Sequence, residues 1–149
     1  IQVRLRSRFD PGEPFVSILK YKQYWSNDFI CSLRRFFRPA KALKLIGTSI
    51  YSVQNPEICH PKYIKKLLIG FYLVPSSTLN WANLAILVDR DSYLRIIIKR
   101  AEQTRSKKYI NGFKNIEIEL NSMWWVKNNF KILLAPGLFK HKRLSDRGY

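Results

Sequence analysis

The sequence predicts an α+β protein of two small lobes, in which helices pack on short mixed or antiparallel sheets. Three observations support this class: an apolar stripe with helical periodicity begins near Asp28, short runs rich in β-branched and aromatic residues recur along the chain, and turn residues separate these segments. The length of 149 residues is enough to bury a core. We expect an N-terminal extension at residues 1–27, an α/β lobe at residues 28–98 and a β-rich lobe at residues 99–149.

The N-terminal extension begins with alternating apolar and arginine residues. Residues 1–9 fit either a half-buried strand with a cationic face or a basic arm that orders on its partner. Residues 10–14 contain two prolines and a glycine, so a turn or linker follows.

The first clear helix is predicted to begin at Asp28, with Ser26 or Asn27 as its cap and Pro39 ending it. Its apolar residues form a stripe that we expect to face the core: Ile30, Leu33 and Phe37. Its basic residues are expected on the surface, where they face solvent or RNA: Arg34, Arg35, Arg38 and Lys41.

Three further elements are predicted before residue 75. Residues 45–53 read as a strand, and a second helix begins at Pro56 or Pro61 and ends at Gly70. Residues 71–74 read as another strand.

The segment from residue 84 to residue 109 is predicted to be a β-hairpin with a basic exit. Two apolar runs, residues 84–88 and 93–98, flank the polar residues 89–92, which suit a type I turn. The second strand would then deliver several cations and one aromatic ring to a single place: Lys99, Arg100, Arg105, Lys107, Lys108 and Tyr109.

The last third contains a second set of apolar runs. Apolar and acidic residues alternate over residues 116–120, which predicts a strand with one solvent-exposed face. Residues 132–135 read as a buried strand. Trp124 and Trp125 suit either the core or a protein interface, or stacking on unpaired bases. The Pro-Gly pair at residues 136–137 suggests a turn whose backbone amides approach phosphate.

The charge of the chain indicates a polyanionic partner. Lys and Arg number 27 against 10 Asp and Glu, a formal net charge of +17 that nucleic acid would neutralise. The longest apolar run, residues 67–74, falls short of the ~20 residues that span a bilayer, so we expect no membrane partner.

The sequence gives no sign of an enzyme, a cofactor or a metal site. Cys31, Cys59, His60 and His141 lack the close paired spacing of a zinc site, and two cysteines make no disulfide framework. Asp89 and Asp91 are explained by turn chemistry. A fragment of an intron-encoded maturase, or another basic RNA-processing factor, remains the alternative to a purely structural RNA-binding protein.

Several segments resemble, in order and spacing, the family of the eighth small-subunit ribosomal protein. Residues 28–40 resemble the family's first helix with its Asp-x-Ile start, and residues 70–73 resemble its Gly-Tyr-Ile. Residues 98–101 with 108–110 resemble its Ile-Lys-Arg-Val and the following Val-Tyr. Residues 130–138 stand where the family has its Ser-Thr-Ser loop, before a basic segment at 140–147. Pro39 stands where the family has Asn. Leu133, Leu134 and Ala135 replace the loop hydroxyls, and the chain ends where the family has its final strand.

The resemblance implies a structural constituent of the small ribosomal subunit that binds the central domain of small-subunit ribosomal RNA, beside neighbouring ribosomal proteins. Its divergence suggests a mitochondrial rather than a plastid ribosome. The expected RNA contacts combine the basic helix, the basic exit and the Pro-Gly turn: Arg34, Arg35, Arg38, Lys41, Lys99, Arg100, Arg105, Lys107, Lys108, Tyr109, Ala135, Pro136, Gly137 and Lys140.

Overall fold

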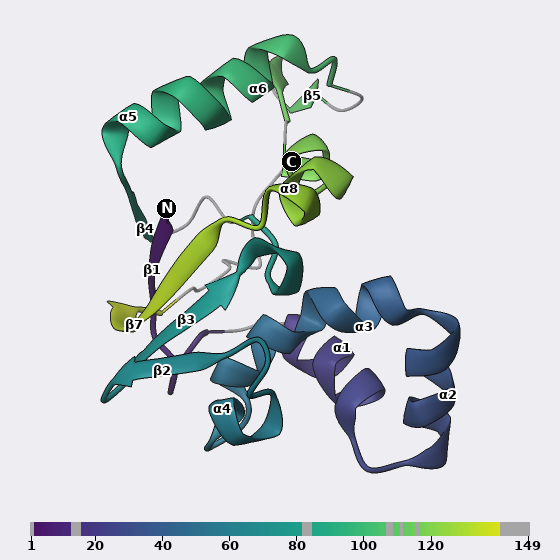
Figure 1. Ribbon diagram of the computed structural model, residues 1–149. Helices are drawn as coiled ribbons and strands as arrows, with labels where there is room; N and C mark the ends of the chain where they lie inside the picture. Colours follow the sequence, from purple (N-terminus) through teal and green to yellow (C-terminus); the bar gives the residue numbers. More distant parts are fainter. Residues whose placement is uncertain are drawn as a thin grey trace, which may run out of the picture.

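The computed structural model describes residues 2–12, 16–81, 85–106, 109–110, 112–115 and 117–140 (Figure 1). It confirms the α+β class. The strands are β1 (Gln2–Arg6), β2 (Lys65–Leu68), β3 (Phe71–Pro75), β4 (Ile86–Val88), β5 (Tyr109–Ile110), β6 (Phe113–Lys114) and β7 (Lys131–Phe139). The α-helices are α1 (Val16–Trp25), α2 (Phe29–Phe37), α3 (Pro39–Leu45), α4 (Pro56–Cys59), α5 (Arg90–Ser92), α6 (Lys99–Gln103), α7 (Glu117–Leu120) and α8 (Met123–Asn128). Two 3-10 helices, η1 (Ile46–Tyr51) and η2 (Ser76–Thr78), and a π-helical stretch, η3 (Tyr93–Ile98), complete the set.

A five-stranded mixed sheet of order β2-β3-β7-β1-β4 forms the centre of the fold. β1 and β7 run parallel, and the other neighbouring pairs are antiparallel. β1 comes from the predicted extension, β2 to β4 from residues 28–98, and β7 from residues 99–149. The boundaries drawn from the sequence therefore do not coincide with separate sheets, and the N-terminal segment is an inner strand.

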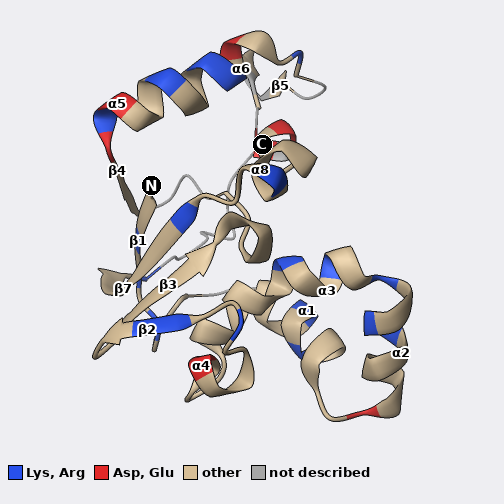
Figure 2. Cartoon of the chain, viewed as in Figure 1, with Lys and Arg blue, Asp and Glu red and all other residues tan. Residues whose placement is uncertain are grey.

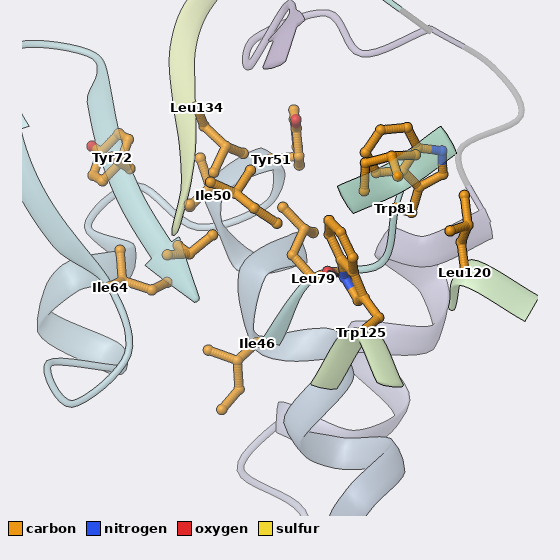
Figure 3. Packing of buried hydrophobic residues seen from close by; sticks show 13 residues of the cluster. Ile46, Ile50, Tyr51, Ile64, Tyr72, Leu79, Trp81, Leu120, Trp125 and Leu134 are labelled. Carbon is orange, nitrogen blue, oxygen red and sulfur yellow. Dashed lines mark hydrogen bonds between the residues drawn. The ribbon is translucent and has the colours of Figure 1, made fainter. Parts of the chain in front are cut away.

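The core lies on the sheet face that carries Ile132 and Leu134, which are 0% and 1% exposed (Figure 3). This confirms the buried strand predicted at residues 132–135. Trp125 of α8 and Leu79 close the core, and the indole Nε1–H of Trp125 donates to the carbonyl oxygen of Leu79 at 2.8 Å. The core interpretation of Trp125 is thus confirmed.

The strand predicted at the N-terminus is confirmed, but its arginine side chains do not form a solvent-exposed cationic face. Arg4 is 9% exposed, and its parallel partner in the register, Leu134, is a core residue. Burial lowers the pKa of Arg4, with hydrogen bonding to Tyr51 opposing this shift.

Arg8, two residues after β1, ties the sheet to the end of η1. Its guanidinium donates to the carbonyl oxygens of Ile50, Val53 and Gln54 at 2.8, 2.9 and 2.6 Å and to the hydroxyl of Tyr72 at 3.0 Å. A cation at the carboxyl end of a helical segment compensates its unpaired carbonyls. The N-terminal arginines are therefore structural, so they are not available as an RNA-binding arm.

The turn predicted at residues 136–137 is instead a bulge within β7. Opposite β1, Arg4 pairs with Leu134 and Arg6 with Phe139, so the register shifts between them. Gly137 has φ +72°, a conformation that favours glycine.

We expect Gly137→Ala to destabilise the protein by about 2 kcal/mol or more, because a Cβ there would overlap the backbone of Arg6 in addition to the strained φ. Urea unfolding of the variant measures this effect. Gly112→Ala is the control, since Gly112 also has positive φ but has nothing within 4 Å of the added Cβ. Equal losses in the two variants would contradict the proposed close approach.

Residues 45–51 of the strand predicted at residues 45–53 are helical. α3 continues to Leu45, and all six residues of η1 are buried. A short, continuous apolar run fits a buried helix as well as a buried strand, which explains the wrong prediction. Gly47 lies in this segment because a Cβ there would come within 2.9 Å of the Leu79 side chain.

Two other predictions of element type are also wrong. The second predicted helix does begin at Pro56, but it ends at Cys59, and residues from Lys65 form the exposed edge strand β2. Residues 117–120 form the helix α7 rather than a strand. Asn115 favours the helix by accepting the backbone N–H of Glu117 at 3.1 Å.

Within the hairpin predicted at residues 84–109, residues 86–88 form a strand, β4, and residues 90–103 form a continuous helical segment, α5, η3 and α6. Asp89 caps this segment: its carboxylate accepts the backbone N–H of Ser92 at 2.8 Å. The dihedral angles of a type I turn resemble those of a first helical turn, so the same residues suit both. Tyr93 and Ile97, four residues apart, then pack on the core, which is the periodicity of a helix.

His60 is buried against two aromatic side chains of α1. Its Nε2 lies 2.9 Å from the Tyr21 hydroxyl, and its ring meets Trp25 edge-on with centroids 4.6 Å apart. Burial lowers the pKa of His60 below its ordinary value of 6.5. Burial is also the main cause that raises the pKa of Tyr21 to about 12.

Protonation of His60 is easier in the unfolded chain. The free energy of unfolding should therefore keep its maximal contribution from His60 above pH 6.5 and should fall as the pH drops below that value. Denaturant unfolding between pH 7.5 and about pH 5, above the range of ordinary carboxylates, measures it. His60→Gln should flatten the slope. An unchanged slope in that variant would contradict the assignment.

Candidate nucleic-acid interface

The outer side of α5, η3 and α6 carries a row of cations, visible as blue bands in Figure 2. Arg95 and Lys99 are four residues apart and both exposed, and Arg105 is exposed just beyond the end of α6. The helix that buries Tyr93 and Ile97 turns these side chains outward. We call Arg95, Lys99 and Arg105 the basic ridge. Among the described residues, none of these three side chains forms an ion pair with a carboxylate.

A short hairpin, β5–β6, lies beyond α6 (Figure 1) and presents two aromatic side chains. Tyr109 is 60% exposed and Phe113 is 79% exposed. Their register, Tyr109 opposite Lys114 and Ile110 opposite Phe113, places the two rings on opposite faces of the hairpin. The basic ridge and these rings therefore occupy neighbouring parts of one end of the molecule.

Arg100, also expected to contact phosphate, packs α6 against the body. Its guanidinium lies over the Trp124 ring at 5.5 Å, and Trp124 packs on Phe130. This cation–π contact uses the partly buried Trp124 as a support for the helix. Lys107 and Lys108 lie outside the described residues.

Two arginines of the predicted basic surface of α2 bond to α1, although Arg34 stays exposed and Arg35 is only half-buried. Arg34 donates to the carbonyl oxygen of Gln23 at 3.1 Å, and Arg35 donates to that of Tyr24 at 2.6 Å while its guanidinium lies 5.2 Å from the Trp25 ring centroid. These bonds satisfy carbonyls in the last turn of α1.

The other two basic residues predicted here have different surroundings. Arg38 joins α2 to α3 and is exposed, whereas the Lys41 ammonium lies 5.6 Å from the Tyr24 ring centroid. Figure 1 shows α2 and α6 at opposite ends of the molecule, so the structure does not bring the two predicted basic groups into one site.

The predicted phosphate-facing segment at residues 135–137 has apolar surroundings. A Cβ on Gly70 would meet the Pro136 ring at 2.8 Å, and Leu138 is 93% exposed. The Lys140 ammonium pairs with the Asp10 carboxylate at 2.9 Å. This strand end therefore offers less to an RNA backbone than the basic ridge does.

Sequence reasoning missed two residues of this surface. Arg95 was hidden within the run read as a strand, and Phe113 lay in a stretch given no element. The signal that would have found the ridge is the spacing of these residues: Tyr93 and Ile97 are four apart, and so are Arg95 and Lys99. In a helix each pair lies on its own face, whereas in a strand all four side chains would share one face.

The described residues contain no group of three His, Cys, Asp or Glu side chains placed to hold a metal ion. Asp89 has a structural role instead, because its carboxylate caps α5 by accepting the backbone N–H of Ser92. This hydrogen bond is the main cause that lowers the pKa of Asp89. No helix in the described ranges has the length and apolar character needed to cross a membrane.

Comparisons of the whole chain with protein-family models, curated proteins and solved structures found no match.

Proposed function

We propose that this protein is a structural RNA-binding protein whose basic ridge and neighbouring aromatic hairpin form the RNA interface. The observation that carries the proposal is the exposure of Arg95, Lys99 and Arg105 on one end of the molecule, beside exposed Tyr109 and Phe113. Cations of this kind contact phosphates, and exposed rings stack on unpaired bases.

Single-stranded or irregular RNA suits this surface better than a regular duplex does. Unpaired bases offer faces to Tyr109 and Phe113, whereas paired bases in an A-form helix are stacked away from side chains. The wider excess of 27 basic over 10 acidic residues favours approach of any nucleic acid.

We further propose that the RNA is small-subunit ribosomal RNA of a mitochondrial ribosome and that the protein acts without catalysis. The support is the resemblance of residues 28–40, 70–73, 98–101 with 108–110, and 130–138 to the eighth small-subunit ribosomal protein family, together with the charge. Of these segments, 28–40 and 70–73 contain a capped helix and a strand at the expected places.

Sedimentation of the tagged protein from mitochondrial lysate, with sequencing of crosslinked RNA, tests the ribosomal proposal. We expect the protein in the small-subunit peak, with crosslinks in the central domain of its RNA. Recovery away from ribosomes on unspliced intron RNA would contradict it and would indicate a maturase-type role.

A further inference from the structure

The helix α2 presents an apolar face to solvent. Over nine residues it exposes five large apolar side chains, which we call the apolar α2 face: Phe29 (76% exposed), Ile30 (53%), Leu33 (40%), Phe36 (77%) and Phe37 (73%). Ile30, Leu33 and Phe37 were predicted to face the core, so the structure corrects that prediction. At about 100° per residue these five positions cover an arc of about 120°.

Contacts on the other side of α2 hold the helix in this orientation. Cys31, nearly opposite the centre of the arc, is 4% exposed, and its thiol lies 3.8 Å from the carbonyl oxygen of Lys22 in α1. Arg34 and Arg35 donate to other α1 carbonyls. Rotating the apolar residues inward would break these bonds and leave the α1 carbonyls without their arginine donors.

Contiguous exposed apolar surface of this kind marks a binding site for another apolar surface. Phe36 and Phe37 meet edge-on with ring centroids 5.3 Å apart, so the two rings form one contiguous aromatic surface rather than scattered side chains. Aromatic ridges of this sort are typical anchors of protein–protein interfaces.

The charges around the apolar α2 face indicate the partner's chemistry. The exposed basic residues along and just after α2 are Arg34, Arg38 and Lys41, and the acidic residue at its start, Asp28, uses its carboxylate to accept the backbone N–H of Ile30. A second copy of this strongly basic chain would bring cations against cations. We propose that the apolar α2 face docks an acidic amphipathic helix of a partner protein.

A lipid surface fits these observations less well. A nine-residue helix is one short anchor, whereas stable membrane attachment generally needs two signals. The proposal is separate from RNA binding, because the basic ridge lies at the other end of the molecule (Figure 1).

A synthetic peptide serves as the probe: an 18-residue amphipathic helix with leucines on one face and glutamates on the other, compared with a twin carrying lysines in place of glutamates. We expect fluorescence anisotropy to show binding of the acidic peptide to the full chain and no binding of the basic twin. Phe36→Ser with Phe37→Ser should weaken binding at least about tenfold. Phe9→Ser, at an exposed aromatic side chain outside both proposed surfaces (84% exposed), is the matched control and should bind as the parent does.

Circular dichroism first establishes that the double variant keeps its fold, as expected for exposed residues. Equal affinity of the double variant and the parent, or equal affinity for the two peptides, would overturn the proposal. Binding only to vesicles of phosphatidylcholine with 30% phosphatidylserine would assign the face to a membrane. Self-association lost in the double variant, with no peptide binding, would assign it to a second copy.

Discussion

Trp125→Ala is expected to lower the free energy of unfolding by about 4 kcal/mol or more. Trp125 is 2% exposed, and its indole fills the space between Trp81 and Phe130, whose ring centroids lie 5.5 and 5.2 Å away. Removing a buried tryptophan costs about 3–5 kcal/mol. Loss of its hydrogen bond also leaves the Leu79 carbonyl unpaired, which adds about 1–3 kcal/mol.

Urea unfolding followed by circular dichroism measures this change, which is a large part of the stability of a typical domain, about 5–15 kcal/mol. Trp124→Ala is the matched control, because Trp124 is only partly buried. The decrease in the free energy of unfolding should be smaller for Trp124→Ala than for Trp125→Ala. A cost for Trp125→Ala no larger than that for Trp124→Ala would show that the sheet and the C-terminal helices do not share one core.

Neutralising the basic ridge is expected to weaken RNA binding by about two orders of magnitude at 0.1 M salt. Each phosphate contact contributes about 0.7–0.9 to the slope of log affinity against log salt concentration. The variant Arg95→Gln, Lys99→Gln, Arg105→Gln should therefore reduce that slope by about 2–3. Titration of a single-stranded RNA at several salt concentrations gives both quantities.

A control variant removes the same charge elsewhere: Lys20→Gln, Lys65→Gln, Lys131→Gln, all exposed residues outside the ridge. If binding depends on the ridge, this control should change the slope by much less. Equal changes in the two triple variants would mean that net charge alone, rather than the ridge, attracts the RNA.

Local rules predicted the existence of α2 but not its orientation. Asp28 has a side chain that caps the helix, although it is the cap itself rather than the first helical residue. Helical spacing of Ile30, Leu33 and Phe37 indicated an amphipathic helix, yet which face meets the body depends on where α1 ends. The carbonyls at that end hold Arg34 and Arg35, which periodicity cannot reveal.

The sheet was harder to predict because its central pairing joins the two ends of the chain. β1 and β7 pair in parallel from Gln2 opposite Ile132, a contact with no local sequence signal. Residues 71–74 and 132–135 were recognised as strands by their β-branched and aromatic content, and the structure confirms both. Runs such as Tyr93–Ile98 have the same content but fold as a helix, because burial of Tyr93 and Ile97 outweighs β propensity.

The candidate site was predicted in part. Lys99, Arg105 and Tyr109 lie at the end of the molecule that we assign to RNA, as expected from the basic exit. Arg34, Arg35 and Arg100 carry the same charge but bond to carbonyls or an aromatic ring. Charge is visible in a sequence, whereas the contacts that occupy a cation depend on the tertiary fold.

Ultraviolet crosslinking of the full chain to RNA, followed by mass spectrometry of the crosslinked peptides, tests the central claim most directly. The account predicts crosslinks in peptides that contain Tyr109, Phe113 or residues 95–105, and their loss in the triple variant of the basic ridge. Crosslinks confined to the α2 peptide, or retained in the triple variant, would contradict an RNA interface at this end of the molecule.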